Sequence, residues 1–85
     1  MDFSFLLEQL VWAKGRLALG FDPNYVRMDA YGTLIERKQY GNRDSLYGWE
    51  IDHIVPQSLG GSDSLTNLRP LNWHNNVRRQ AGLLA

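Results

Sequence analysis

The chain of 85 residues contains no cysteine, so disulfide bonds and metal sites made of thiolates are excluded. Its apolar N-terminal stretch can neither cross a membrane nor serve as a secretory signal, because charged residues interrupt it at Asp2, Glu8, Lys14 and Arg16. A chain without disulfides suits the reducing cytoplasm, where we expect this protein to act without membrane contact. The length predicts one domain, residues 1–85, with a small core.

The chain also lacks a net charge, since nine Lys and Arg residues balance nine Asp and Glu residues. The balance is uneven, however, because the segment from Ser64 to the C-terminus carries Arg69, Arg78 and Arg79 and no acidic residue. A local group of arginines can bind phosphates whatever the average charge of the protein is. These three arginines are therefore candidates for contacts with a nucleic-acid backbone.

Periodicity predicts the elements of the N-terminal half. Apolar residues recur at helical spacing and predict one amphipathic helix over residues 3–19, which Gly20 ends. Residues 25–29 and 33–36 are predicted to form a short hairpin. Residues 47–55 alternate in polarity as a strand does, with Glu50 and Asp52 on one face.

The C-terminal half is predicted to be a loop followed by a helix. Residues 57–71 have the composition of a loop, and Asn72 is a suitable cap for a helix over residues 73–82. An apolar stripe on this helix is expected to face the core, and its members are Trp73, Val77, Ala81 and Leu84.

Angles around this helix rank its polar residues. At about 100° per residue, Asn76 lies about 60° to one side of the stripe, at the edge of the core. Arg79 lies about 60° beyond Asn76, whereas Arg78 points nearly the other way. His74 lies about 160° from Asn76 and is therefore a poor partner for it in a metal site.

Four polar residues have a spacing that points to chemistry. Asp52 stands beside His53, and Asn67 and Asn76 follow at intervals of fourteen and nine residues. A hard divalent cation prefers oxygen ligands such as a carboxylate or an amide carbonyl, and usually keeps several waters. An imidazole can take a proton from water near neutral pH. Together these groups predict a one-metal nuclease that hydrolyses phosphodiester bonds.

The sequence DHIVPQS, followed by GG, NL and the later Asn, resembles the HNH endonucleases of the ββα-metal (His-Me finger) type over about residues 31–80. The resemblance implies an α+β fold, in which residues 25–85 hold hairpins, a loop and the ββα-metal core, with an added N-terminal helix. It implies that Asp52 and Asn76 bind the metal and that His53 is the general base. It also implies that Asn67 belongs to the catalytic site and fixes the loop behind His53. The metal of this family is most often magnesium or manganese.

The chain departs from the family pattern in two ways. It lacks the Cys-x-x-Cys pairs that hold a structural zinc in many members, so apolar packing must replace them; the candidates are Trp49, Ile51, Leu68, Leu71, Trp73 and Val77. It also has Gln80 where colicin-type relatives have a further metal-binding histidine. Zinc or nickel is therefore less favoured than magnesium or manganese.

Asp52 and His53 are neighbours in the predicted strand, and this poses a geometric problem. Neighbouring side chains of a regular strand point to opposite faces, yet both residues must reach one scissile phosphate. We therefore predict a bulge or bend in the strand at His53.

The expected function is a metal-dependent DNA endonuclease that nicks double-stranded DNA with low sequence specificity. Two alternatives remain open: a non-catalytic DNA-binding module that keeps the ββα fold, and a nuclease directed at RNA. A structural zinc module is excluded, because two histidines 21 residues apart without any cysteine cannot form the usual closed site. The oligomeric state stays open; a monomer would nick, whereas a dimer could cut both strands.

Overall fold

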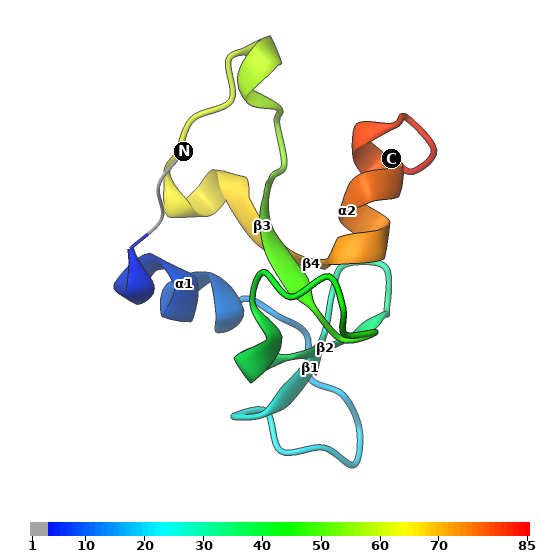
Figure 1. Cartoon of the computed structure of the whole chain (residues 1–85). Coiled ribbons are helices and arrows are strands. Elements are labelled where there is room, and N and C mark those ends of the chain that lie inside the picture. Colours follow the sequence, from blue (N-terminus) through cyan, green and yellow to red (C-terminus); the bar gives the residue numbers. More distant parts are fainter. Residues whose placement is uncertain (1–3) are drawn as a thin grey trace.

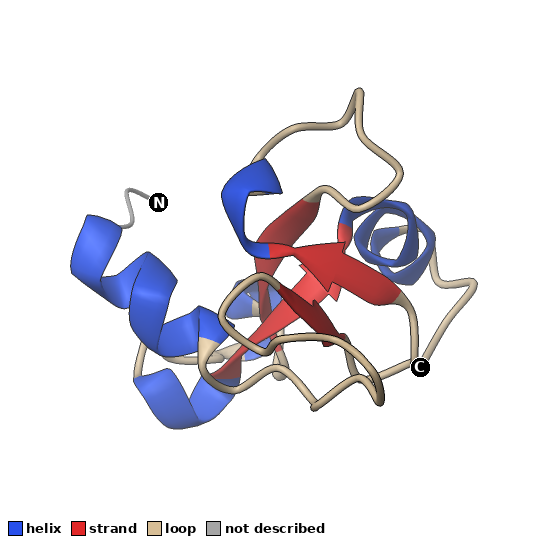
Figure 2. Cartoon of the chain, turned by 90° about the horizontal axis from the view of Figure 1, so that it is seen from below, coloured by secondary structure: helices blue, strands red, loops and turns tan. Residues whose placement is uncertain are grey.

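The computed structural model describes residues 4–85 and has an α+β fold, as predicted. Its elements in chain order are α1 (Phe5–Trp12), β1 (Val26–Met28), β2 (Leu34–Glu36), β3 (Trp49–His53), β4 (Leu68–Asn72) and α2 (Trp73–Gln80). The strands form two antiparallel pairs, β1 with β2 and β3 with β4. The β3–β4 pair lies between α1 on one side and α2 on the other (Figures 1 and 2). The order β3, β4, α2 is compatible with an HNH ββα core.

The first helix is shorter than the predicted range 3–19, of which residue 3 lies outside the described residues. It is capped by Ser4, whose Oγ accepts a hydrogen bond from the Leu7 N–H at 3.2 Å, and it ends at Trp12. Two turns follow, and the chain then pairs with β1 through hydrogen bonds in both directions between Arg16 and Met28. The apolar spacing continues past the end of the helix through residues that the structure leaves exposed, so periodicity overestimated its length.

Gly15 is the residue that lets the chain turn after α1. A Cβ at this position would lie 3.0 Å from Cδ of Arg27 and 3.1 Å from the carbonyl oxygen of Trp12. Arg27 fills this space and donates hydrogen bonds to the carbonyl oxygens of Gly15 and Pro23. The close approach of the arginine stem therefore leaves little room for a larger side chain at this turn.

The predicted hairpin is confirmed as β1 and β2, which pair from Val26↔Glu36 to Met28↔Leu34. The turn between them is organised by Asp29, whose Oδ1 accepts the N–H groups of Tyr31 at 3.0 Å and Thr33 at 2.9 Å. An aspartate that binds backbone groups two and four residues further on stabilises such a turn.

The prediction of a loop over residues 57–71 is wrong at its end, because residues 68–72 form the strand β4. The prediction failed because Pro70 lies in the middle of the strand, where a proline usually argues against sheet structure. Hydrogen-bonded pairs alternate in an antiparallel ladder, and the Ile54 N–H donates to the Asn67 carbonyl oxygen at 2.8 Å. The Ile51↔Pro70 pair lies three positions from the hydrogen-bonded pair of Ile54 and Asn67, so by alternation it is a non-hydrogen-bonded pair. The ladder therefore does not need the N–H that proline lacks.

Helix α2 begins as predicted, since the Asn72 side chain accepts the His74 N–H at 3.0 Å. Its buried face is not the predicted apolar stripe. Asn75 is 7 % exposed, whereas Val77 is 40 % exposed. The helix turns this polar residue inward because Nδ2 of Asn75 donates to the buried Asp29 carboxylate at 2.9 Å and to Oγ1 of Thr33 at 2.8 Å.

The core lies between α1 and the β3–β4 pair. It consists of the buried residues Val11, Trp12, Ile35, Trp49 and Leu68, with Ile51 packed against them. The rings of Trp12 and Trp49 pack with their centroids 5.4 Å apart, a tilted contact that adds about 1 kcal/mol to the burial of apolar area. The predicted core residues Trp49, Ile51, Leu68 and Leu71 are thus placed correctly, Trp73 is half-buried and Val77 is wrong. Within residues 4–85 the structure has no helix that is suited to crossing a bilayer.

Candidate functional site

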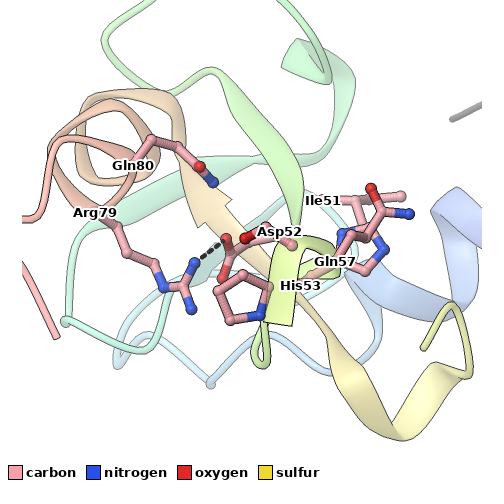
Figure 3. Close-up of a pocket in the computed structure, with 8 residues that line it drawn as sticks. Ile51, Asp52, His53, Gln57, Arg79 and Gln80 are labelled. Carbon is pink, nitrogen blue, oxygen red and sulfur yellow. Dashed lines mark hydrogen bonds and ion pairs between the residues drawn. The ribbon is translucent and has the colours of Figure 1, made fainter. Parts of the chain in front are cut away.

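A hollow of about 270 Å³ opens where β3 ends beside α2 (Figure 3). The turn after β3 forms its third wall through Gln57 and its neighbours. The labelled residues around the hollow are Ile51, Asp52, His53, Gln57, Arg79 and Gln80. Two of the four residues singled out from the sequence, Asp52 and His53, therefore border one cavity.

The Asp52 carboxylate is fully buried between two arginines. Its Oδ2 accepts a hydrogen bond from Nε of Arg69 at 2.9 Å, and its Oδ1 accepts one from Nη1 of Arg79 at 3.1 Å. Figure 3 shows the second of these contacts, which joins β3 to α2. A buried carboxylate needs such partners because its desolvation is costly. The site thus holds a negative charge that two cations compensate.

A bulge, one of the two irregularities predicted at His53, is not found; instead β3 ends at His53 and the backbone bends at the next two residues, 54 and 55. The register runs without interruption from Trp49↔Asn72 to His53↔Leu68. Side chains therefore alternate: Asp52 contacts α2, whereas Nε2 of His53 lies 2.8 Å from Oδ1 of Asp63 in the loop that follows the strand. The strand ends at His53, so the hollow at its end is bordered by residues from both faces without a bulge.

Asn67 joins the end of β3 to the loop of residues 60–64, named the 60–64 loop below. Its Oδ1 accepts the Val55 N–H at 2.8 Å, and its Nδ2 donates to the carbonyl oxygens of Val55 at 3.1 Å and Ser62 at 2.8 Å. All polar groups of this amide are thus directed at backbone on both sides of the loop. These contacts hold the backbone that follows His53 in one place.

The amide of Asn76 is oriented by a carboxylate. Its Nδ2 donates to Oε1 of Glu50 at 2.9 Å, while its Oδ1 is buried and has no hydrogen-bond partner among residues 4–85. Glu50 is itself held by Arg43 through Nε and Nη2, at 2.7 and 2.8 Å. Burial would raise the pKa of Glu50, but hydrogen bonds from Arg43 and Asn76 and the charge of Arg43 outweigh it, so the pKa is lowered. An ionised carboxylate only accepts hydrogen bonds, which fixes the amide nitrogen toward Glu50 and the oxygen away from it.

The three candidate arginines are placed differently. Arg79 contacts Asp52 and also donates from Nη2 to the Ile54 carbonyl oxygen at 2.6 Å. Its Nε is buried and has no partner in the part of the chain that the structure describes. Arg69 donates to Asp52 and lies over the Tyr31 ring at 5.5 Å. Arg78 is exposed and does not border the hollow. His74 is also exposed, with its ring 3.9 Å from that of Trp73.

The donor set of the site fits a hard cation. Within the described part of the chain, no three His, Cys, Asp or Glu residues are grouped as a metal site. The candidate oxygens are those of the Asp52 carboxylate on β3, which the two arginines contact, and the Oδ1 of Asn76 on α2, which has no partner among the described residues and does not line the hollow. Carboxylate and amide oxygens suit magnesium or manganese, whereas zinc and nickel favour nitrogen and sulfur.

Sequence reasoning missed Asp63 and Glu50. Asp63 lies in a segment whose Gly and Ser content predicts a flexible loop, so no local pattern ties it to His53. Glu50 had a usable signal, because the alternation of β3 places it on the same face as Asp52. Glu50 precedes the proposed ligand Asp52 by two residues, and its carboxylate was therefore a candidate for orienting the amide of Asn76.

Comparison with known proteins assigns part of the chain to a family. The family model described as HNH endonuclease matches residues 36–82. The chain is also 40% identical over 47 residues to a protein named "Probable mobile endonuclease C" from Enterobacteria phage T4; the match covers 53% of this chain and 21% of that protein. The chain thus aligns with about a fifth of the relative's length. No solved structure matches. Because the family model covers more than half of the chain and spans Asp52, His53, Asn67 and Asn76, the chain belongs to the HNH endonuclease family.

Proposed function

We propose that the protein is a metal-dependent endonuclease that hydrolyses phosphodiester bonds in double-stranded DNA. The observation that carries this proposal is that the buried Asp52 carboxylate and the imidazole of His53 border one hollow. The buried Oδ1 of Asn76 on α2, which has no partner among the described residues, is a second candidate oxygen ligand. His53 borders the same hollow and supplies the group that can accept a proton.

Asp52 and Asn76 would hold one magnesium or manganese ion, with water in the remaining positions. Such an ion, when bound, polarises the phosphate and neutralises the departing 3′ oxygen. The two residues lie on separate elements that are tied together by Arg79 and Glu50. Arg79 therefore has to share Asp52 with the cation, and its other N–H groups remain for the phosphate.

His53 acts as the general base and removes a proton from the attacking water. Attack opposite the 3′ oxygen leaves a 5′ phosphate and a 3′ hydroxyl. Asn67 supports this step from behind, because it holds the Val55 backbone two residues after His53. Its role is to place the imidazole rather than to touch the substrate.

Arg79, which lines the hollow, and Arg69, which donates to the same Asp52 carboxylate, would hold the flanking phosphates. The exposed Arg78 lies outside the hollow and would contact more distant backbone. Phosphate contacts hold the backbone but carry no sequence information. Low sequence specificity follows. A single site cuts one strand at each encounter, so a monomer produces nicks.

Incubation with supercoiled plasmid tests this function. We expect conversion to nicked circles in manganese or magnesium, slower conversion in zinc or nickel, and none after chelation. Retardation of DNA without cleavage in any metal would instead identify a non-catalytic DNA-binding module. Faster cleavage of single-stranded RNA than of plasmid would identify a nuclease directed at RNA. Linear product without a nicked intermediate would contradict nicking by a monomer.

Manganese affinity tests the metal ligands separately from turnover. In Glu50→Gln the new amide can donate to Asn76, so the Asn76 oxygen is no longer fixed on the side away from residue 50. We expect manganese binding, measured by calorimetry, to weaken about tenfold, as for other groups that orient metal ligands. Arg43→Gln is the matched control, because it removes the exposed partner of Glu50 and keeps the contact with Asn76. Equal affinities in the two variants would contradict this role of Glu50.

A further inference from the structure

The carboxylate of Asp63 makes a direct contact with the proposed base. Its Oδ1 lies 2.8 Å from Nε2 of His53 and also accepts a hydrogen bond from Nε2 of Gln57 at 3.2 Å. The His53 side chain is 13% exposed, whereas that of Asp63 is 59% exposed. The imidazole is thus mostly covered, and the acid reaches it from the solvent side.

An exposed ion pair of this kind usually contributes little, because both side chains move freely. Here the backbone directly before Asp63 is fixed at two residues of the 60–64 loop. The Gly61 N–H donates to the Pro56 carbonyl oxygen at 2.9 Å, and the Ser62 carbonyl oxygen accepts from Asn67. A Cβ at Gly61 would lie only 1.7 Å from the Val55 carbonyl oxygen. Only glycine allows the loop to pack this closely against the backbone that follows His53.

We infer that Asp63 is a positioning residue that fixes the tautomer and orientation of His53 through the contact with Nε2. This inference rests on the proposed function, in which His53 is the general base. An ionised carboxylate only accepts hydrogen bonds, so the facing Nε2 carries the proton. In a neutral imidazole the lone pair is then on Nδ1, which is the atom that takes the proton from water. The imidazolium that forms faces the negative charge of Asp63, as in other carboxylate–histidine pairs that act in hydrolysis.

The same contacts extend the role of Asn67. Its Nδ2 holds Ser62, the residue directly before Asp63, and its Oδ1 holds Val55, which lies two residues after His53. One amide therefore sets the distance between the base and the carboxylate. The 60–64 loop is then a support for the base instead of a flexible connection.

The tautomer of His53 is measured by long-range ¹⁵N–¹H spectroscopy on histidine-labelled protein, which has two histidines to assign. We expect Nε2–H in the wild type and loss of this preference in Asp63→Ala. Asp63→Asn keeps the shape of the side chain, but its amide nitrogen can donate, so we expect a mixture or reversal. Asp44→Ala, a change of an exposed acid in another turn, is the matched control and should keep the wild-type spectrum.

Kinetics give the second readout. We expect kcat of plasmid nicking to fall about 10–100-fold in Asp63→Ala and Asp63→Asn, as for other groups that orient a reactive side chain. The KM for plasmid and the affinity for manganese should stay unchanged, because Asp63 borders neither Asp52 nor Asn76 in the contacts that hold them. A wild-type tautomer in Asp63→Ala would overturn the inference whatever the activity is. An unchanged kcat in both Asp63 variants, with activity that still depends on His53, would overturn it and leave the proposed function standing.

Discussion

His53→Ala should lower kcat of plasmid nicking by about 10²–10⁴-fold, the usual contribution of a general base. The imidazole borders the hollow but makes none of the contacts of Asp52 or Asn76. Manganese binding and DNA retardation should therefore remain close to those of the wild type. A loss that falls on kcat and spares binding is the pattern of a group that acts only in the transition state. Single-turnover nicking rates, with calorimetry for manganese, measure both parts.

His74→Ala is the matched control for this experiment. It removes the chain's other histidine, which is exposed on α2 and packs against Trp73 away from the hollow. Its nicking rate should equal that of the wild type. A His53→Ala protein that nicks as fast as the wild type would exclude His53 as the base. Equal losses in the two variants would point to damage of the fold, which urea unfolding of each protein detects.

Local signals in the sequence predicted local structure well. Three features are confirmed: the cap at Asn72, the hairpin of β1 and β2, and the alternation of β3. Each depends only on residues that lie close together in the sequence. The motif around Asp52 and His53 also led to the HNH family, which the family model shows independently. Its spacing is informative because several types of residue must agree at fixed intervals.

Contacts between distant residues decided what the sequence could not predict. Asn75 faces inward because it meets Asp29, which lies 46 residues away, and helical periodicity carries no information about such a partner. Pro70 concealed β4, because its compatibility depends on which pairs of the ladder are hydrogen-bonded. The pairing of His53 with Asp63 likewise depends on how a glycine-rich loop folds back. In each case the deciding contact belongs to the tertiary structure.

The bulge predicted at His53 failed for a different physical reason. Asp52 and His53 do lie on opposite faces of β3, as the alternation of a strand predicts. The missing information was where the strand ends. Because β3 ends at His53, and the turn around Gln57 encloses the space beyond it, both faces border one hollow. A residue at the end of a strand can therefore share a site with its neighbour without a distortion of the strand.

Asp29→Ala should have the largest effect on stability, a loss of about 3–5 kcal/mol in the free energy of unfolding. Its buried carboxylate accepts four hydrogen bonds: two from the turn of the first hairpin, one from the Asn72 N–H at 3.0 Å and one from Nδ2 of Asn75 at 2.9 Å. Alanine would leave the Asn72 N–H without this partner and one of the two N–H groups of Asn75 Nδ2 unpaired, at about 1–3 kcal/mol each; the other N–H of Nδ2 still donates to Oγ1 of Thr33. Urea unfolding followed by tryptophan fluorescence measures the loss.

Asp29→Asn separates the hydrogen bonds from the shape of the side chain. Its oxygen can still accept the N–H groups of the hairpin turn, but its amide nitrogen then faces two further donors, on Asn72 and Asn75. Asparagine should therefore be scarcely better than alanine, whereas Asp22→Ala, an exposed turn aspartate, should cost less than about 1 kcal/mol. A loss below 1 kcal/mol for both Asp29 variants would contradict this role.

The Asp29 variants should also affect nicking through stability. The free energy of unfolding of a small domain is only about 5–15 kcal/mol in total, and Asp29 fixes the start of the helix that carries Asn76 and Arg79. Loss of nicking in these variants should therefore follow the unfolded fraction and be recovered where the protein is folded.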